Sequence, residues 1–128
     1  MRKPMPNFPC EFEIPDEWWV DAGMAGFTPT AQAYRSSTGA ELVPLTQIEP
    51  PYRNPTVAKD WRGFDRERMI SVLRGIATGA EIEPVPLLLL PSGTFLFPAP
   101  YGYRVKDGFH RFYASIAAGF ECLPGGVM

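Results

Sequence analysis

The chain has few of the residues that build metal centres and disulfide frameworks. Its 128 residues include two cysteines and a single histidine. No CxxC pair and no cysteine–histidine spacing typical of zinc ligands occurs, so no protein-held metal centre is expected. Cys10 and Cys122 lie near opposite ends of the chain, and the sequence leaves open whether they form a disulfide. Without one, Cys122 is interpreted as a small buried apolar residue.

Long apolar runs and an excess of one charge are also absent. The longest apolar run, residues 85–90, is broken by Pro86 and is far too short to span a bilayer. No apolar segment follows the basic N-terminal residues, so we expect no signal peptide, no membrane partner and a reduced, cytoplasmic protein. A net charge of −2 argues against bulk, non-specific DNA binding.

Arginine is locally concentrated although the overall charge is balanced. Asp65 and Glu67 are interleaved with this cluster, which indicates a solvated helix face rather than a nucleic-acid surface. The clustered residues are Arg62, Arg66, Arg68 and Arg74. DNA is not an expected partner, although the cluster leaves that alternative open.

Proline and glycine are abundant, with 15 and 12 residues, and predict a chain rich in turns and loops. The length indicates one domain with a modest core. Residues 1–15 carry four prolines and are expected to be irregular. Residues 28–40, rich in small and hydroxyl side chains, are expected to form a loop or a short helix.

Apolar residues at helical spacing predict two clear helices. The first covers residues 65–78, with Asp65 as its N-cap and Gly79 as its end. The second covers residues 109–118 and ends at Gly119. Strands are predicted at residues 41–48, 83–90, 94–97, 101–106 and 120–123. The unbroken apolar character of residues 83–90 indicates burial on both faces, and the order of elements predicts an α+β domain.

Two adjacent tryptophans mark the N-terminal part of the chain. A short helix is expected to begin at Asp16 and to stop near Gly23. Trp18 and Trp19 would point about 100° apart on this helix. One is therefore expected in the core, and the other over a groove or against a partner. The alternative is that both are half-buried and close a small core.

The segment DGFHRFYA, residues 107–114, holds the only histidine and lies where a predicted strand passes into a predicted helix. Gly108 at such a turn lets the backbone approach a ligand closely, unless it is an ordinary turn glycine. The amides and dipole of the first helical turn favour an anion there. His110 and Arg111 lie on that turn and can supply charge-assisted hydrogen bonds. The segment therefore predicts a phosphate pocket.

Beyond residue 41 the ordered set of motifs resembles the ParB/sulfiredoxin superfamily, in particular the ParB-like N-terminal domain. The similarity covers residues 42–124. It begins with LVPLTQIEPPYR, continues through a glycine-ended helix and the strand EPVPLLLL, and closes with VKDGFHRFYASIAAGFECLP, similar to the family's D-G-x-H-R-x-x-A helix. The resemblance implies a small mixed sheet with packed helices in residues 42–128, and residues 1–41 are expected to form an irregular extension of the same compact unit.

The superfamily is functionally mixed, and the function must come from the site. Its members include nucleotide-hydrolysing DNA-partition proteins, ATP-using sulfiredoxins, a free-serine kinase and proteins described as nucleases. Their shared feature is phosphate or nucleotide binding at the turn that corresponds to residues 107–111. The resemblance thus implies ATP or another nucleotide as cofactor, with or without Mg²⁺. Sulfiredoxins carry a nucleophilic cysteine where this chain has Phe109, so sulfinic acid reduction is not expected.

Each residue of the turn has a functional and a structural interpretation. His110 would bind a phosphate oxygen or act as an acid, or else cap the turn. Arg111 would bind phosphate bidentately, or else pair with Asp107 or Glu83. Asp107 would orient His110, bind Mg²⁺ through water or act as a base, or else serve as a helix N-cap. Gly108 and Phe109 complete the expected nucleotide-binding turn.

Three further residues are assigned to the site with weaker support. Arg53 matches the family's turn arginine and would close over the nucleotide, or else be a solvated loop residue. Glu49 is a candidate general base, with a surface glutamate as the alternative. Lys106 precedes the motif and would reach a ribose or a phosphate.

Three classes of function remain in competition. The first is a nucleotide-dependent phosphotransferase or NTPase. The second is a non-catalytic interaction module, a toxin–antitoxin, phage or plasmid accessory component, which would oligomerise or bind a protein partner through an N-terminal aromatic surface. That surface would consist of Trp18, Trp19, Met24 and Phe27. The third is a nuclease, which the sparse metal-ligating carboxylates disfavour.

Overall fold

The computed structural model describes residues 1–6, 11–37, 39–49, 64–90 and 101–127. Several predicted features lie outside these residues and are not placed by the structure. They are Cys10, the turn arginine Arg53, Arg62, the loop at residues 56–63 and the strand at residues 94–97.

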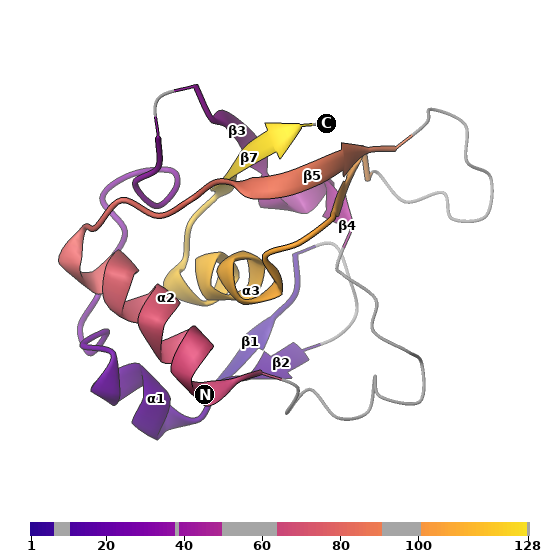
Figure 1. Cartoon of the computed structure of the whole chain (residues 1–128). Coiled ribbons are helices and arrows are strands. Elements are labelled where there is room, and N and C mark those ends of the chain that lie inside the picture. Colours follow the sequence, from indigo (N-terminus) through magenta and orange to yellow (C-terminus); the bar gives the residue numbers. More distant parts are fainter. Residues whose placement is uncertain (7–10, 38, 50–63, 91–100, 128) are drawn as a thin grey trace.

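The described residues form a mixed α+β structure with three α-helices (Figure 1). The helices are α1 (Asp16–Asp21), α2 (Arg66–Thr78) and α3 (Phe109–Ala118). The strands are β1 (Arg2–Pro4), β2 (Glu11–Glu13), β3 (Glu41–Pro44), β4 (Ile48–Glu49), β5 (Val85–Leu89), β6 (Tyr103–Val105) and β7 (Cys122–Val127), and a 3-10 turn, η1, spans Leu45–Gln47. The α+β class predicted from the sequence is confirmed.

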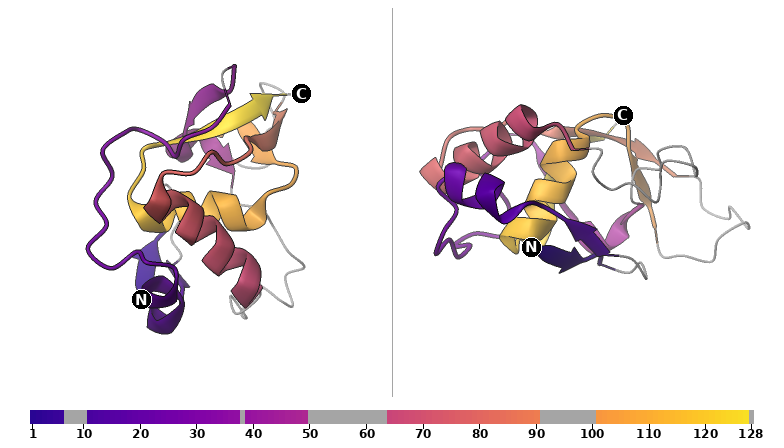
Figure 2. Two further views of the ribbon diagram at one scale, coloured as in Figure 1. Left: turned by 60° about the vertical axis from the view of Figure 1, so that its left-hand side comes forward. Right: turned by 90° about the horizontal axis from the view of Figure 1, so that it is seen from below.

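Five strands form a mixed sheet in the order β3-β7-β5-β6-β4. The β3–β7 and β5–β6 pairs are antiparallel, whereas β5–β7 and β4–β6 are parallel. Helices α2 and α3 lie on one side of this sheet, and β1 and β2 lie beyond α3 (Figures 1 and 2). Helix α3 is thus enclosed between the sheet and the β1–β2 pair, which explains why seven of its ten residues are buried.

The predicted helix ends are confirmed by their capping geometry. Asp65 Oδ2 accepts a hydrogen bond from the Arg68 main-chain N–H at 2.9 Å, as an N-cap should. Gly79 and Gly119 end α2 and α3 with φ angles of 70° and 91°. These left-handed conformations are those that glycine adopts at little cost, so the sequence signal has a direct physical cause.

The prediction that residues 1–15 are irregular is wrong. β1 and β2 pair antiparallel, with Lys3 opposite Phe12. In β2 the buried Phe12 stands between the exposed Glu11 and Glu13, an alternation typical of a half-buried strand. The Phe12 ring packs edge-on against Tyr113 at a centroid distance of 5.0 Å. The extension therefore belongs to the core.

Three strand predictions also need correction. The last strand, expected at residues 120–123, runs over Cys122–Val127. The single strand expected at residues 41–48 is divided by the 3-10 turn that follows Pro44. Burial of the 83–90 strand on both faces is wrong, since Leu88 and Leu89 are 39% and 62% exposed. Leu88 alternates with the fully buried Leu87 and so faces the side of the sheet that the described helices do not cover.

Most side chains of the proposed N-terminal aromatic surface pack against other residues of this chain. Trp18 and Trp19 are both half-buried against the core, so the alternative of two half-buried aromatics is confirmed. Met24 is fully buried, and Phe27 packs on Phe120 at 6.0 Å between ring centroids. Met24 and Phe27 therefore make their contacts within this chain. Residues 28–37 and 39–40 contain no helix or strand, which agrees with the loop, rather than the short helix, expected for this segment.

Cys122 carries a free thiol at the start of β7. It is half-buried rather than fully buried as expected, and burial raises the pKa of its thiol. None of the helices in the described part of the chain has the length and apolar character needed to cross a bilayer.

Replacing Phe12 with alanine tests whether the β1–β2 pair is part of the core. Because the ring is 2% exposed and contacts Tyr113, we expect Phe12→Ala to lower the free energy of unfolding by about 3–5 kcal/mol. Val20→Ala, at a 62% exposed apolar side chain, is the control and should change stability by less than about 0.5 kcal/mol. Equal urea midpoints for the two variants would show that the pair is peripheral.

Candidate functional site

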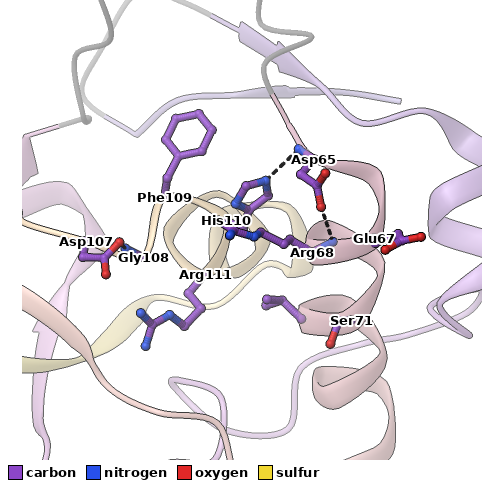
Figure 3. Close-up of a pocket in the computed structure, with 10 residues that line it drawn as sticks. Asp65, Glu67, Arg68, Ser71, Asp107, Gly108, Phe109, His110 and Arg111 are labelled. Carbon is purple, nitrogen blue, oxygen red and sulfur yellow. Dashed lines mark hydrogen bonds between the residues drawn. The ribbon is translucent and has the colours of Figure 1, made fainter.

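The starts of α2 and α3 line one open pocket of about 590 Å³ (Figure 3). Two segments far apart in sequence contribute to it. From α2 and its N-cap come Asp65, Glu67, Arg68, Ser71 and Val72, and from the turn into α3 come Asp107, Gly108, Phe109, His110 and Arg111. The structure thus brings the predicted phosphate turn together with a second helix start.

A hydrogen bond joins the two helix starts directly. The main-chain N–H of Asp65 donates to His110 Nε2 at 2.8 Å, and His110 is only 9% exposed. An imidazole nitrogen that accepts a hydrogen bond carries no proton, so the proton of the neutral ring is on Nδ1. Nε2 is therefore engaged within the protein, which favours the structural interpretation of His110 over a phosphate ligand acting through that atom.

The two helix starts differ in how they are capped. The Asp65 carboxylate caps α2. The N-cap of α3 is Gly108, with φ of 95° and no side-chain capping bond. Asp107 Oδ1 instead accepts from the Gly108 N–H at 2.8 Å, so this carboxylate supports the turn rather than the first helical turn itself. An anion at the start of α3 would meet no competing capping side chain.

Arg111 is held by main-chain carbonyls. Its Nη1 donates to the carbonyl oxygens of Pro84 at 2.9 Å and Glu83 at 3.2 Å. Arg111 thus bonds to main-chain carbonyls, and not to the Asp107 or Glu83 carboxylate as the alternative interpretation expected. The guanidinium lies over Gly108, where a Cβ atom would come within 2.9 Å of Arg111 Nη2. The positive φ favours glycine here, and a larger residue would also displace the end of the Arg111 side chain.

The α2 wall of the pocket was not identified from the sequence. Arg68 and Ser71 are three residues apart, so they lie on the same face of the helix, and both line the pocket. Figure 3 shows the Arg68 side chain extending from α2 toward α3. The interpretation of the arginine cluster as a merely solvated face is therefore incomplete. Arg66 and Arg74 turn the other way and donate to the Oδ2 atom and the carbonyl of Asp21.

Two residues assigned to the site do not line this pocket. Glu49 lies on β4, an edge strand, where its Oε2 accepts from Arg104 Nε and Nη2, each at 3.1 Å. This contact of two arginine donors with one carboxylate oxygen favours a structural carboxylate over a general base. The main-chain N–H of Lys106 donates to the Pro86 carbonyl, and its side chain is not part of the pocket wall.

No group of three or more histidine, cysteine, aspartate or glutamate side chains that could hold a metal ion occurs among the described residues. Comparison of the chain with protein-family models, with curated proteins and with solved structures found no match. The chemistry of the pocket must therefore be argued from its own residues.

The bond between Asp65 and His110 can be tested by two substitutions of similar size. In His110→Gln the side-chain oxygen can occupy the position of Nε2, whereas in His110→Asn it falls short. We expect the asparagine variant to lose about 0.5–1.5 kcal/mol of unfolding free energy relative to the glutamine variant, because the partly buried hydrogen bond of the Asp65 N–H loses its acceptor. Urea denaturation of both proteins measures the difference. Equal stabilities would contradict a structural role for this bond.

Proposed function

We propose that this chain is a phosphate- or nucleotide-binding protein whose anion site is the pocket between the starts of α2 and α3. The observation that carries the proposal is the start of α3, which has a glycine N-cap without a side-chain capping bond and opens into a pocket that contains two arginines. Helix amides and the helix dipole attract an anion at such an end.

The two arginines approach this helix start from different sides. Arg68 extends across the pocket from α2, and Arg111 lies on the side of Asp107 and Gly108 (Figure 3). Guanidinium groups bind phosphate oxygens bidentately and keep their charge at all physiological pH values. Ser71, one helical turn from Arg68, adds a hydroxyl donor to the same wall. This set of donors suits an anion with several oxygens, such as a phosphate chain.

Three carboxylates line the same pocket and act against an anion there. Asp65 caps α2, and Asp107 accepts from the Gly108 N–H. Figure 3 shows Glu67 directed away from His110 and α3. Two of the three carboxylates thus accept main-chain N–H hydrogen bonds, but all three keep their charge. An anion at the start of α3 therefore depends on Arg68 and Arg111 and on the helix dipole to outweigh them.

The pocket size favours a nucleotide over a single phosphate ion. Small-molecule sites commonly enclose about 300–1,000 Å³, and this pocket, at about 590 Å³, falls within that range. Phe109 and Val72 add apolar surface to the polar wall. Both parts are needed to hold a base or sugar beside its phosphates.

The finer assignment is to a ParB/sulfiredoxin-like fold with nucleotide-dependent phosphotransfer or hydrolysis. It is supported by the order of elements after residue 41 and by the D-G-x-H-R turn at the start of α3. Asp107 is the exposed carboxylate nearest to this turn in sequence and is the proton acceptor we assign. Any Mg²⁺ would be held mainly by the nucleotide phosphates, as Mg²⁺ commonly is.

Removing either arginine should weaken nucleotide binding. We expect Arg68→Gln and Arg111→Gln each to raise the Kd for ATP about tenfold or more, since each deletes charge-assisted hydrogen bonds to phosphate. Calorimetric titration with ATP, ADP and CTP, each with and without Mg²⁺, measures this. The binding should also weaken as ionic strength rises.

Arg104→Gln is the matched control for these variants. It makes the same change in charge and shape at a 55% exposed arginine that pairs with Glu49 and does not line the pocket. We expect its nucleotide Kd to stay within about twofold of the unmodified chain. Equal losses in all three variants would show that binding follows overall charge, and saturable binding unaffected by Arg68→Gln and Arg111→Gln would place the ligand elsewhere.

A further inference from the structure

The guanidinium of Arg111 is fixed at one end. Its two hydrogen bonds to described residues, with the Glu83 and Pro84 carbonyls, both come from Nη1. The other edge of the group, formed by Nε and Nη2, lies over Gly108 at 3.1 Å and 2.9 Å from the position that a Cβ atom would take. That edge carries two parallel N–H donors, the arrangement that binds two oxygens of one phosphate.

A segment of the N-terminal part without helix or strand, residues 32–36, lies against the chain near these carbonyls. We term it the strap. The Gln32 carbonyl accepts from the N–H groups of Glu121 and Cys122, just after α3. The Arg35 carbonyl accepts from the Ile82 N–H, just after α2. The strap therefore ties together the chain segments that leave both helices of the site.

Within the strap, one side chain reaches a carbonyl that also holds Arg111. Tyr34 Oη donates to the Glu83 carbonyl at 2.7 Å, and Tyr34 is 4% exposed. Burial raises the pKa of Tyr34 above its usual value, against the opposing charge of Arg111, so the hydroxyl remains a donor at all physiological pH values. The Glu83 carbonyl is thus held from one side by Tyr34 while it holds Arg111 on the other.

We propose that Tyr34 is a positioning residue for anion recognition, which acts by fixing the Glu83 carbonyl so that Arg111 presents its Nε–Nη2 edge to a tetrahedral oxyanion. This inference rests on the proposed anion site and adds to it a residue outside the pocket. Because an arginine held in advance loses less side-chain entropy on binding, the strap raises affinity without touching the ligand. The fork geometry selects phosphate-like groups over monatomic anions.

The strap supplies its own matched control. Ser36 Oγ donates to the Ile82 carbonyl at 2.6 Å, one residue before the carbonyl that Tyr34 holds. Tyr34→Phe and Ser36→Ala each delete one hydroxyl bond from the strap to this connection, but only the first bond is made to a partner of Arg111. A purely structural strap should respond similarly to both changes.

The test is a double-substitution cycle with inorganic phosphate as the probe. We expect Tyr34→Phe to raise the phosphate Kd about three- to tenfold in the unmodified chain, and to have almost no effect when Arg111 is replaced by lysine, which lacks the fork. Ser36→Ala should change the Kd by less than about twofold in either background. Two results would overturn the proposal. One is that Tyr34→Phe changes the phosphate Kd equally with arginine or lysine at position 111. The other is that Tyr34→Phe and Ser36→Ala change it equally.

A ligand-free measurement separates this inference from the proposed function. In NMR spectra the Arg111 Nε–Hε signal should have a chemical shift distinct from the signals of exposed arginines. Ser36→Ala should leave this shift unchanged. Tyr34→Phe should move it toward the shifts of exposed arginines. An Arg111 Nε–Hε chemical shift that is the same in Tyr34→Phe as in the unmodified chain would overturn the positioning role. A signal that depends on Tyr34, in a chain that binds neither phosphate nor any nucleotide, would support the positioning role and refute the anion site.

Discussion

The hydrogen bond from the Asp65 N–H to His110 Nε2 sets the geometry on which the candidate site depends. It joins residues 45 positions apart in sequence and places the starts of α2 and α3 at the same pocket. Each helix start carries partial positive charge, and Arg68 and Arg111 add two full charges. The only histidine of the chain is thus used to assemble the site, and the anion affinity we propose follows from the groups that it brings together.

The surrounding fold packs against both helices of the site. Helix α3 is enclosed between the five-stranded sheet and the β1–β2 pair (Figure 2). Phe12 of β2 packs against Tyr113 of α3. Beyond their C-terminal ends, α2 and α3 are tied to the strap, residues 32–36. The residues before β3 therefore complete the core and brace the site, so they are more than an extension attached to a finished domain.

Capped elements could be predicted from the sequence, because their signals are local. Asp65 and Gly79 bound α2, and Gly119 ends α3, through conformations that involve only neighbouring residues. The partners of His110 and Arg111 could not be predicted in this way. Both side chains bond to main-chain groups of distant segments, and a main-chain N–H or carbonyl has no sequence signature. The β1–β2 pair was missed because four prolines outweighed the short alternation around Phe12.

Chemical-shift mapping with ATP tests the central claim most directly. Because one pocket is built from two helix starts, titration should shift main-chain amide signals in residues 65–71 and in residues 107–111 together, with the same Kd. Glu49 and Arg104, which lie outside the pocket, should be unaffected. Shifts confined to one helix start, or centred on another face of the molecule, would contradict the account.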